Sequence, residues 1–119
     1  MLKLVTAVVC ESASEAAPYT LIRVRKRWRT PPAELCVYLE VLNATGEPYD
    51  VAAQIRRKST IVAAFETELV LMSKRDLDEV ILTLPLEGLE PRTYGINLLL
   101  NGVVADTLWV DFGHPEAAI

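Results

Sequence analysis

The sequence predicts an all-β protein, an antiparallel β-sandwich of about seven or eight strands. Apolar and polar residues alternate along most of the chain, and the spacing of apolar residues that is typical of helices is almost absent. Turn-forming stretches such as TPP, NATGEP and LEGLEP separate the alternating segments. We expect strands over residues 2–10, 18–28, 34–43, 50–58, 61–72, 78–86, 92–100 and 103–112.

The length and net charge of the chain indicate how many domains it has and which kinds of partner to expect. Its 119 residues suit one domain with a hydrophobic core, so we expect a single domain over 1–119 with a flexible tail at 112–119. The net charge of −4 argues against general binding to a phosphate backbone. The apolar run at 4–10 is too short for a secretion signal or a membrane span. We therefore expect a cytoplasmic protein without membrane contact.

The dipeptide Asn101-Gly102 lies between two apolar runs and predicts a type I′ hairpin turn, because both central residues of that turn need positive φ. Leu100 then pairs with Val103. Two of the pairs that follow along the strands, Tyr94 with Trp109 and Arg92 with Asp111, are an aromatic pair and an opposite-charge pair, and both kinds stabilise neighbouring strands. Counting outward without irregularity pairs Leu98 with Ala105, Ile96 with Thr107, Tyr94 with Trp109 and Arg92 with Asp111.

The two faces of this hairpin have different expected surroundings. Tyr94 and Trp109 are expected on the side that meets the core. The opposite side carries Asn97 and Asp106 but is half apolar, so another element or a second subunit is expected to cover it. The predicted interaction residues on that side are Leu99, Val104, Leu108 and Val110.

Alternation also assigns faces in the other strands. Cys36 is expected to point outward, and Cys10 inward with Leu2 and Leu4, which argues against a disulfide between the cysteines. Two free thiols and one histidine do not complete a zinc site of Cys and His ligands, so we expect no metal. The expected core residues of 34–43, 61–72 and 78–86 include Leu35, Val37, Leu39, Val41, Phe65, Val80, Leu82, Leu84 and Leu86.

The stretch RVRKRWRT, residues 23–30, is the most basic part of the chain. As a strand it carries arginines on one face and mostly apolar residues on the other, which is typical of a solvated face paired with glutamates of neighbouring strands, such as Glu40, Glu66 and Glu68. A nucleic-acid contact with Trp28 stacking on a base, and an acidic protein partner, are the alternatives. The basic patch consists of Arg23, Arg25, Lys26, Arg27 and Arg29.

No group of residues points to catalysis or to a cofactor. His114, the only imidazole, is in the C-terminal tail, and the serines lie in turn-like contexts without a nucleophile-elbow pattern. The acidic stretch with Asp76, Asp78 and Glu79 lacks the pattern of a calcium loop. We therefore expect a protein that is not an enzyme.

Three segments carry a resemblance to a known family. VVCESASEAAPYTLIRVRKRW resembles the opening, NATGEPYDVAAQIRR the middle and LEPRTYGINLLLNGVVADTLWV the close of a family of small bacterial domains of unknown function. Arg23 departs from the small residue usual in that family, and Glu11 from the usual Asp. The resemblance implies an immunoglobulin-like β-sandwich and no catalytic residues.

Together these features predict a non-catalytic protein-interaction or assembly module. The half-apolar sheet face predicts self-association, and hence a homo-oligomer. The alternative prediction is a nucleic-acid-binding protein that uses the basic stretch at 23–29.

Overall fold

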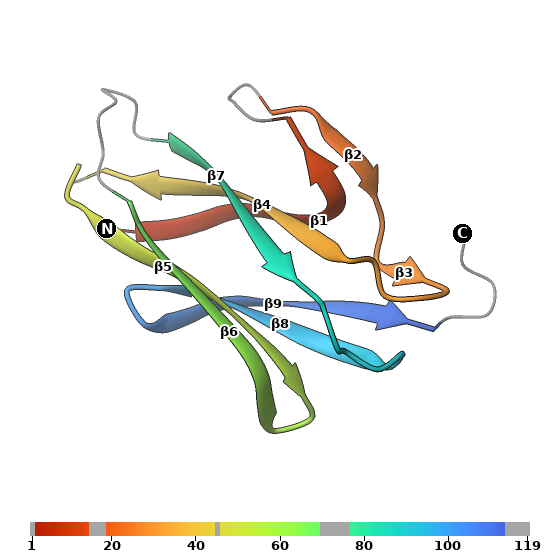
Figure 1. Ribbon diagram of the computed structural model, residues 1–119. Helices are drawn as coiled ribbons and strands as arrows, with labels where there is room; N and C mark the ends of the chain where they lie inside the picture. The colour runs from red at the N-terminus through yellow and green to blue at the C-terminus, as the bar shows by residue number, and fades with distance from the viewer. Residues whose placement is uncertain (1, 15–18, 45, 70–76, 114–119) are drawn as a thin grey trace.

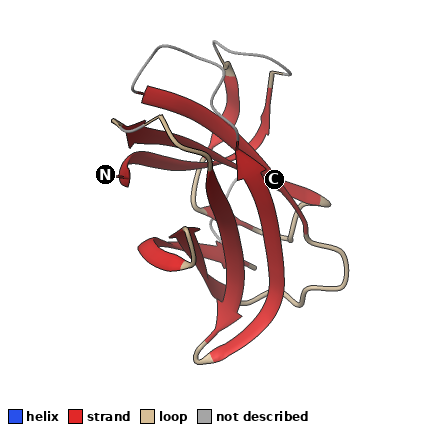
Figure 2. Ribbon diagram, turned by 90° about the vertical axis from the view of Figure 1, so that its left-hand side faces the viewer, coloured by secondary structure: helices blue, strands red, loops and turns tan. Residues whose placement is uncertain are grey.

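The structure is a computed structural model that describes residues 2–14, 19–44, 46–69 and 77–113. In this part of the chain, strands form one four-stranded sheet, ordered β2-β1-β4-β7, and one five-stranded sheet, ordered β3-β9-β8-β5-β6 (Figure 1). A view from the side shows only strands and loops in the described chain (Figure 2). The strands are β1 (Leu2–Ala13), β2 (Leu21–Val24), β3 (Arg27–Trp28), β4 (Glu34–Asn43), β5 (Tyr49–Arg57), β6 (Thr60–Leu69), β7 (Leu77–Pro85), β8 (Thr93–Leu100) and β9 (Val103–Phe112).

These strands confirm an all-β fold of two sheets, but there are more of them than predicted. The strand expected at 18–28 is two strands that belong to different sheets. β2 pairs with β1, whereas Arg27 and Trp28 of β3 pair in parallel with the end of β9. The chain therefore crosses from one sheet to the other at Arg25 and Lys26, and the expectation of purely antiparallel pairing is wrong at β3.

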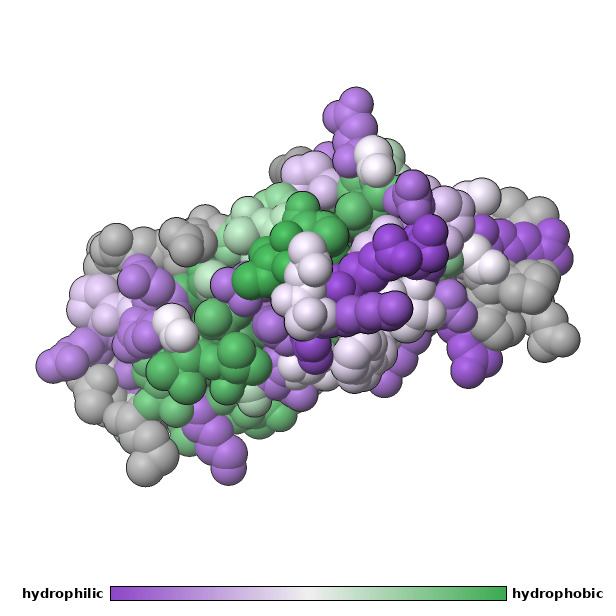
Figure 3. Space-filling view, turned by 90° about the horizontal axis from the view of Figure 1, so that it is seen from below, coloured by the Kyte–Doolittle hydropathy of each residue, from purple (hydrophilic) through white to green (hydrophobic). Residues whose placement is uncertain are grey.

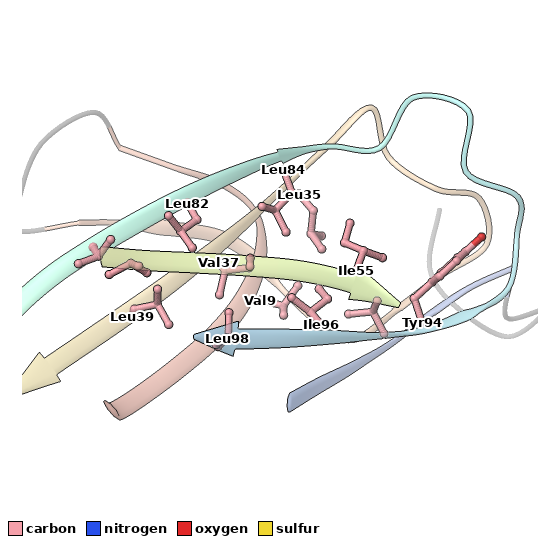
Figure 4. Close-up of a cluster of buried hydrophobic side chains, with 14 of the residues drawn as sticks. Val9, Leu35, Val37, Leu39, Ile55, Leu82, Leu84, Tyr94, Ile96 and Leu98 are labelled. Atoms are coloured by element: carbon pink, nitrogen blue, oxygen red, sulfur yellow. The ribbon is translucent and has the colours of Figure 1, made fainter. Parts of the chain in front are cut away.

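The hydrophobic core lies between the two sheets, where alternate residues of both meet (Figure 4). In β4 the residues predicted to point inward are at most 1% exposed, and those of β7 are also buried, so alternation is confirmed there. Phe65 of β6 packs against the same core, as expected. The central members are Leu35, Val37, Leu39, Val41, Val51, Ala53, Ile55, Leu82, Leu84, Ile96 and Leu98.

A β-bulge in β1 changes which residues of that strand face the core. Leu4 pairs with Val41 but Thr6 pairs with Glu40, so Val5 is an extra residue in the ladder. The strand resumes with Val9 in the core, and Cys10 consequently points to the opposite face. The prediction that Cys10 points inward is wrong, because a single extra residue exchanges the two faces of a strand.

The C-terminal hairpin has the predicted turn. Asn101 and Gly102 have φ of 50° and 78°, as a type I′ turn requires. The Asn101 side chain accepts a hydrogen bond from the backbone N–H of Asp50, which ties the turn to β5. At the other end of the hairpin, Phe112 is buried in the core, so the predicted tail at 112–119 begins too early. Residues 114–119 lie outside the described chain.

Candidate functional site

A second β-bulge, at Ala105, determines which side chains the C-terminal hairpin presents to solvent. Leu99 pairs with Val104 as predicted, but Leu98 pairs with Asp106, so Ala105 is the extra residue. Beyond it the predicted register is shifted by one position. The pairs observed there are Asn97 with Thr107, Ile96 with Leu108, Gly95 with Trp109, Tyr94 with Val110 and Thr93 with Asp111.

The bulge divides the four predicted interaction residues between the two faces of the sheet. Val110 is 1% exposed in the core, and Leu108 packs against the core, so the prediction that these two point outward is wrong. Leu99 and Val104 remain paired on the outer face of the five-stranded sheet. Val104 is 51% exposed there, whereas Leu99 is nearly buried.

Trp109 makes the opposite change and lies on the outer face, not opposite Tyr94 in the core. It is 52% exposed, and its ring lies over Gly95, where an added Cβ would approach the ring to 3.2 Å. The guanidinium carbon of Arg56 is 5.1 Å from the centroid of the same ring, which is a cation–π contact. The bulge therefore creates an exposed aromatic site that alternation alone had placed in the core.

Polar contacts hold this site in place. The Arg56 Nε donates to Asn97 Oδ1 at 3.2 Å, and the Thr107 hydroxyl donates to the same oxygen at 2.9 Å. We call Arg56, Gly95, Asn97, Thr107 and Trp109 the outer-face cluster. No interaction was predicted here from the sequence. A glycine inside a strand signals close approach of another group, so Gly95 is a sequence feature that could have indicated this cluster.

Apolar residues flank the outer-face cluster on the same sheet face. Ile61 pairs with Arg56 across β5 and β6 and is 52% exposed. Val104 and Leu99 lie two rows away, near the β8–β9 turn. The view from below shows apolar areas interrupted by hydrophilic residues, so the surface is mixed and not continuously apolar (Figure 3).

The basic stretch does not form the continuous arginine row that was predicted. Arg23 has a positive φ of 56°, so the backbone leaves regular strand geometry at that residue. Arg23 Nη1 and Arg25 Nη2 lie 3.2 and 3.1 Å from carboxylate oxygens of Glu11. These arginines are therefore paired within the chain, as one prediction had it, with Glu11 of the adjacent strand. The side chains of Glu66 and Glu68, two of the predicted partners, lie outside what the structure describes.

Trp28 is part of the core and not of the surface. It is 3% exposed, and its ring centroid is 5.5 Å from that of Phe112. Arg25 covers it from the outside, with its guanidinium carbon 5.2 Å from the ring centroid. Trp28 is thus not available for stacking on a base, while Lys26, Arg27 and Arg29 are exposed.

Two carboxylates of the acidic stretch that was compared with a calcium loop accept hydrogen bonds from tyrosines. Asp78 accepts a hydrogen bond of 2.7 Å from the Tyr49 hydroxyl, and Glu79 accepts one of 2.9 Å from Tyr38. Burial and these carboxylates raise the pKa of both tyrosines. Asp76 and His114 lie outside the described residues. Within the described ranges, no three His, Cys, Asp or Glu side chains are close enough together to hold a metal ion.

A cavity of about 550 Å³ opens at the end of the sandwich between the start of β1 and the β8–β9 turn. Leu2, Leu4, Leu100 and Val103 supply much of its apolar lining. Of the polar residues there, Asn43 donates from its amide to the carbonyl oxygen of Glu47 at 2.8 Å, so this amide has a turn-stabilising role.

Comparison with models of known protein families and with curated proteins found no match to this chain. The resemblance to small bacterial sandwich domains therefore stays a prediction from sequence motifs. The part of the chain that the structure describes contains no helix long and apolar enough to cross a membrane.

Proposed function

We propose that this protein is a non-catalytic interaction module that self-associates through the outer face of its five-stranded sheet. The observation that carries the proposal is the exposure of Trp109 and Val104 on this face, each about half accessible to solvent. Tryptophan and arginine are enriched among the residues that dominate binding energy at protein interfaces, and here they are in contact with each other. We further propose a cytoplasmic location, which the two free thiols support.

We propose an immunoglobulin-like sandwich as the scaffold. The strand order supports this topology, because β1-β4-β7 and β9-β8-β5-β6 follow the order of strands A-B-E and G-F-C-C′ in such domains. The short β3 lies parallel to β9 at the edge of the five-stranded sheet. In this scaffold the outer face of the five-stranded sheet is a broad surface on rigid strands.

The charges of this face suit a symmetric dimer. A two-fold interface brings the same surface of each copy together, so it needs both signs of charge on one patch. On this face β5 carries Arg56, in contact with Trp109, near one end and the exposed Asp50, between the core residues Tyr49 and Val51, at the other. A second copy of the chain thus offers apolar contact to Trp109 and Val104 and charge pairing at the rim, where such pairs favour specificity over affinity.

Light scattering coupled to size-exclusion chromatography tests the proposal. We expect dimers at tens of micromolar for the unaltered chain, and monomers for Val104→Asp and for Trp109→Ala, because both changes remove apolar contact area at the centre of the interface. Val5→Asp is the matched control, since Val5 is 53% exposed but lies on the other sheet. A chain that stays monomeric at hundreds of micromolar, or a Val5→Asp variant that dissociates equally, would contradict self-association through this face.

Nucleic-acid binding through the basic stretch is the second candidate function. The exposure of Lys26 and Arg27 favours it, whereas the buried Trp28 and the pairing of Arg23 and Arg25 with Glu11 do not. Gel-shift assays at low salt with single-stranded and double-stranded oligonucleotides decide the question. Retardation that disappears in a Lys26→Glu, Arg27→Glu double variant and falls steeply with salt supports this candidate. No retardation at low salt eliminates it.

A further inference from the structure

Cys10 and Cys36 lie directly opposite each other on adjacent antiparallel strands. The ladder between β1 and β4 pairs them as Cα partners. Residues in such pairs have Cα atoms about 4.5 or 5.5 Å apart and project to the same face of the sheet. A disulfide spans Cα separations of roughly 4.4 to 6.8 Å. The bulge at Val5 thus brings into disulfide range two cysteines that uninterrupted alternation places on opposite faces.

The two thiols are enclosed on the face of the four-stranded sheet that points away from the core. Val9 and Val37, their neighbours along each strand, belong to the core, so the cysteines face the other way. They are nevertheless 0% and 7% exposed, respectively. The row across the sheet continues with Val24 on one side and Thr83 on the other. Thr83 Oγ1 lies 3.8 Å from Cys36 Sγ, within the distance of a hydrogen bond to sulfur.

The surroundings keep Cys10 in the thiol form at neutral pH. Burial, and to a lesser extent the neighbouring Cys36, raise the pKa of Cys10 to about 11. Cys36 is the more accessible of the two and is therefore the first to meet a dissolved oxidant.

We propose that Cys10 and Cys36 are a redox-active dithiol that closes to a cross-strand disulfide linking β1 to β4. The oxidant is a low-molecular-weight disulfide such as oxidised glutathione. The Cys36 thiolate attacks one sulfur of the oxidant, forming a mixed disulfide and releasing one thiol. The deprotonated Cys10 then attacks Cys36 Sγ, forming the protein disulfide and releasing the second thiol. Two protein thiols are oxidised, one small disulfide is reduced to two thiols, and the two protons pass to the released thiolates.

Closure would act on a defined part of the fold. Residues 11–35, between the two cysteines, include β2, β3 and the whole basic stretch at 23–30. A bridge at 10–36 would fix the register of β1 on β4 and close this segment into a loop. Disulfides of cytosolic proteins are mostly transient and serve catalysis or redox sensing, so in the proposed compartment the pair would act as a sensor of oxidation.

The test must separate a native dithiol from two cysteines that meet by chance in an unfolded chain. We would bring the full chain to equilibrium in glutathione redox buffers, from both the reduced and the oxidised protein, with and without denaturing urea. Intact mass and peptide mapping report the 10–36 disulfide. We expect the folded chain to be half oxidised in a buffer at least about tenfold more reducing than the one that half oxidises the unfolded chain, because the fold holds the sulfurs together.

Two further measurements complete the test. The oxidised protein should melt roughly 5 to 15 °C above the reduced protein. Phenylarsine oxide, which binds two neighbouring thiols with release of water, should bind the reduced folded chain once. Cys10→Ala and Cys36→Ser should both abolish this binding, and circular dichroism shows whether each variant is folded.

Three results would overturn the proposal. The first is a folded chain that is oxidised no more readily than the unfolded one. The second is an oxidised protein that melts below the reduced protein. The third is a folded chain that accumulates only mixed disulfides with glutathione. Each would mean that the native sheet does not accommodate the bridge.

Discussion

Gly113 lies directly after β9, where the end of that strand contacts Pro91 and β3. Its φ is 100°, and an added Cβ would lie 2.9 Å from Cβ of Pro91. Its N–H donates to the carbonyl oxygen of Trp28, which joins the end of β9 to β3. Because the Pro91 Cβ belongs to a rigid ring, it cannot rotate away from a new side chain. Glycine is thus required here both by the backbone and by close packing.

We predict that Gly113→Ala destabilises the protein by roughly 2 to 4 kcal/mol, from left-handed backbone strain and overpacking together. Gly88→Ala is the matched control, because Gly88 also has a positive φ of 82° but has open space around its Cα. This control should cost about 1 kcal/mol, from the backbone alone. Urea unfolding of both variants measures the difference. Equal losses would show that the contact with Pro91 has no energetic weight.

At the scale of the element, the bulge at Ala105 has the largest consequence. With uninterrupted alternation Val104 and Val110 share a face, whereas the extra residue places Val110 in the core and leaves Val104 exposed. The same shift moves Trp109 from the core to the surface. One inserted residue therefore decides which side chains are available for an interface.

Aspartate substitutions at these two valines test the register directly. Val110→Asp should cost more than about 3 kcal/mol or prevent folding, because it buries a carboxylate without a partner. Val104→Asp should change stability by less than about 1 kcal/mol, since its side chain reaches solvent. The measurement is urea unfolding at a concentration low enough to avoid self-association. Similar losses for the two variants would indicate regular pairing without a bulge.

Alternation predicts the buried side chains correctly where a strand is regular and wrongly where one extra residue interrupts the repeat. β4 and β7 alternate without interruption, and their core residues were predicted correctly. β1 and β9 each contain one extra residue, at Val5 and Ala105, and neither site has a glycine or proline to mark it. Tertiary packing selects such bulges, so local propensity carries no signal for them.

The prediction of one strand through the basic stretch was wrong for a different reason. Its alternation was read as one strand, but the chain changes sheets within it, between Val24 and Arg27. A crossing of this kind depends on the partners β1 and β9, which are distant in sequence. The outer-face cluster could not be predicted for the same reason. Its contacts among Arg56, Gly95 and Trp109 join three strands, and the pairing register of these strands cannot be read from local sequence.

At the scale of the whole molecule, the most completely buried side chains of the shared core lie on a few inner strands of the two sheets. β4 lies inside the four-stranded sheet, and β8 and β5 lie inside the five-stranded sheet. These three strands carry most of the side chains that are almost completely buried, whereas β2 is at an edge and is largely exposed. Stability should therefore be unevenly distributed over the fold, with the highest protection in β4, β5 and β8.

Native-state hydrogen exchange tests this distribution in the reduced protein. We predict that hydrogen-bonded amides of β4 and β8 exchange at least about a hundredfold more slowly than those of β2, because opening β2 exposes little apolar surface while opening β4 or β8 exposes the core. The slowest amides of both sheets should exchange with a common free energy, since the core between them is shared. If β2 were protected as strongly as β4, the hairpin of β1 and β2 would belong to the cooperative core. If β4 and β8 gave clearly different free energies, the two sheets would open independently.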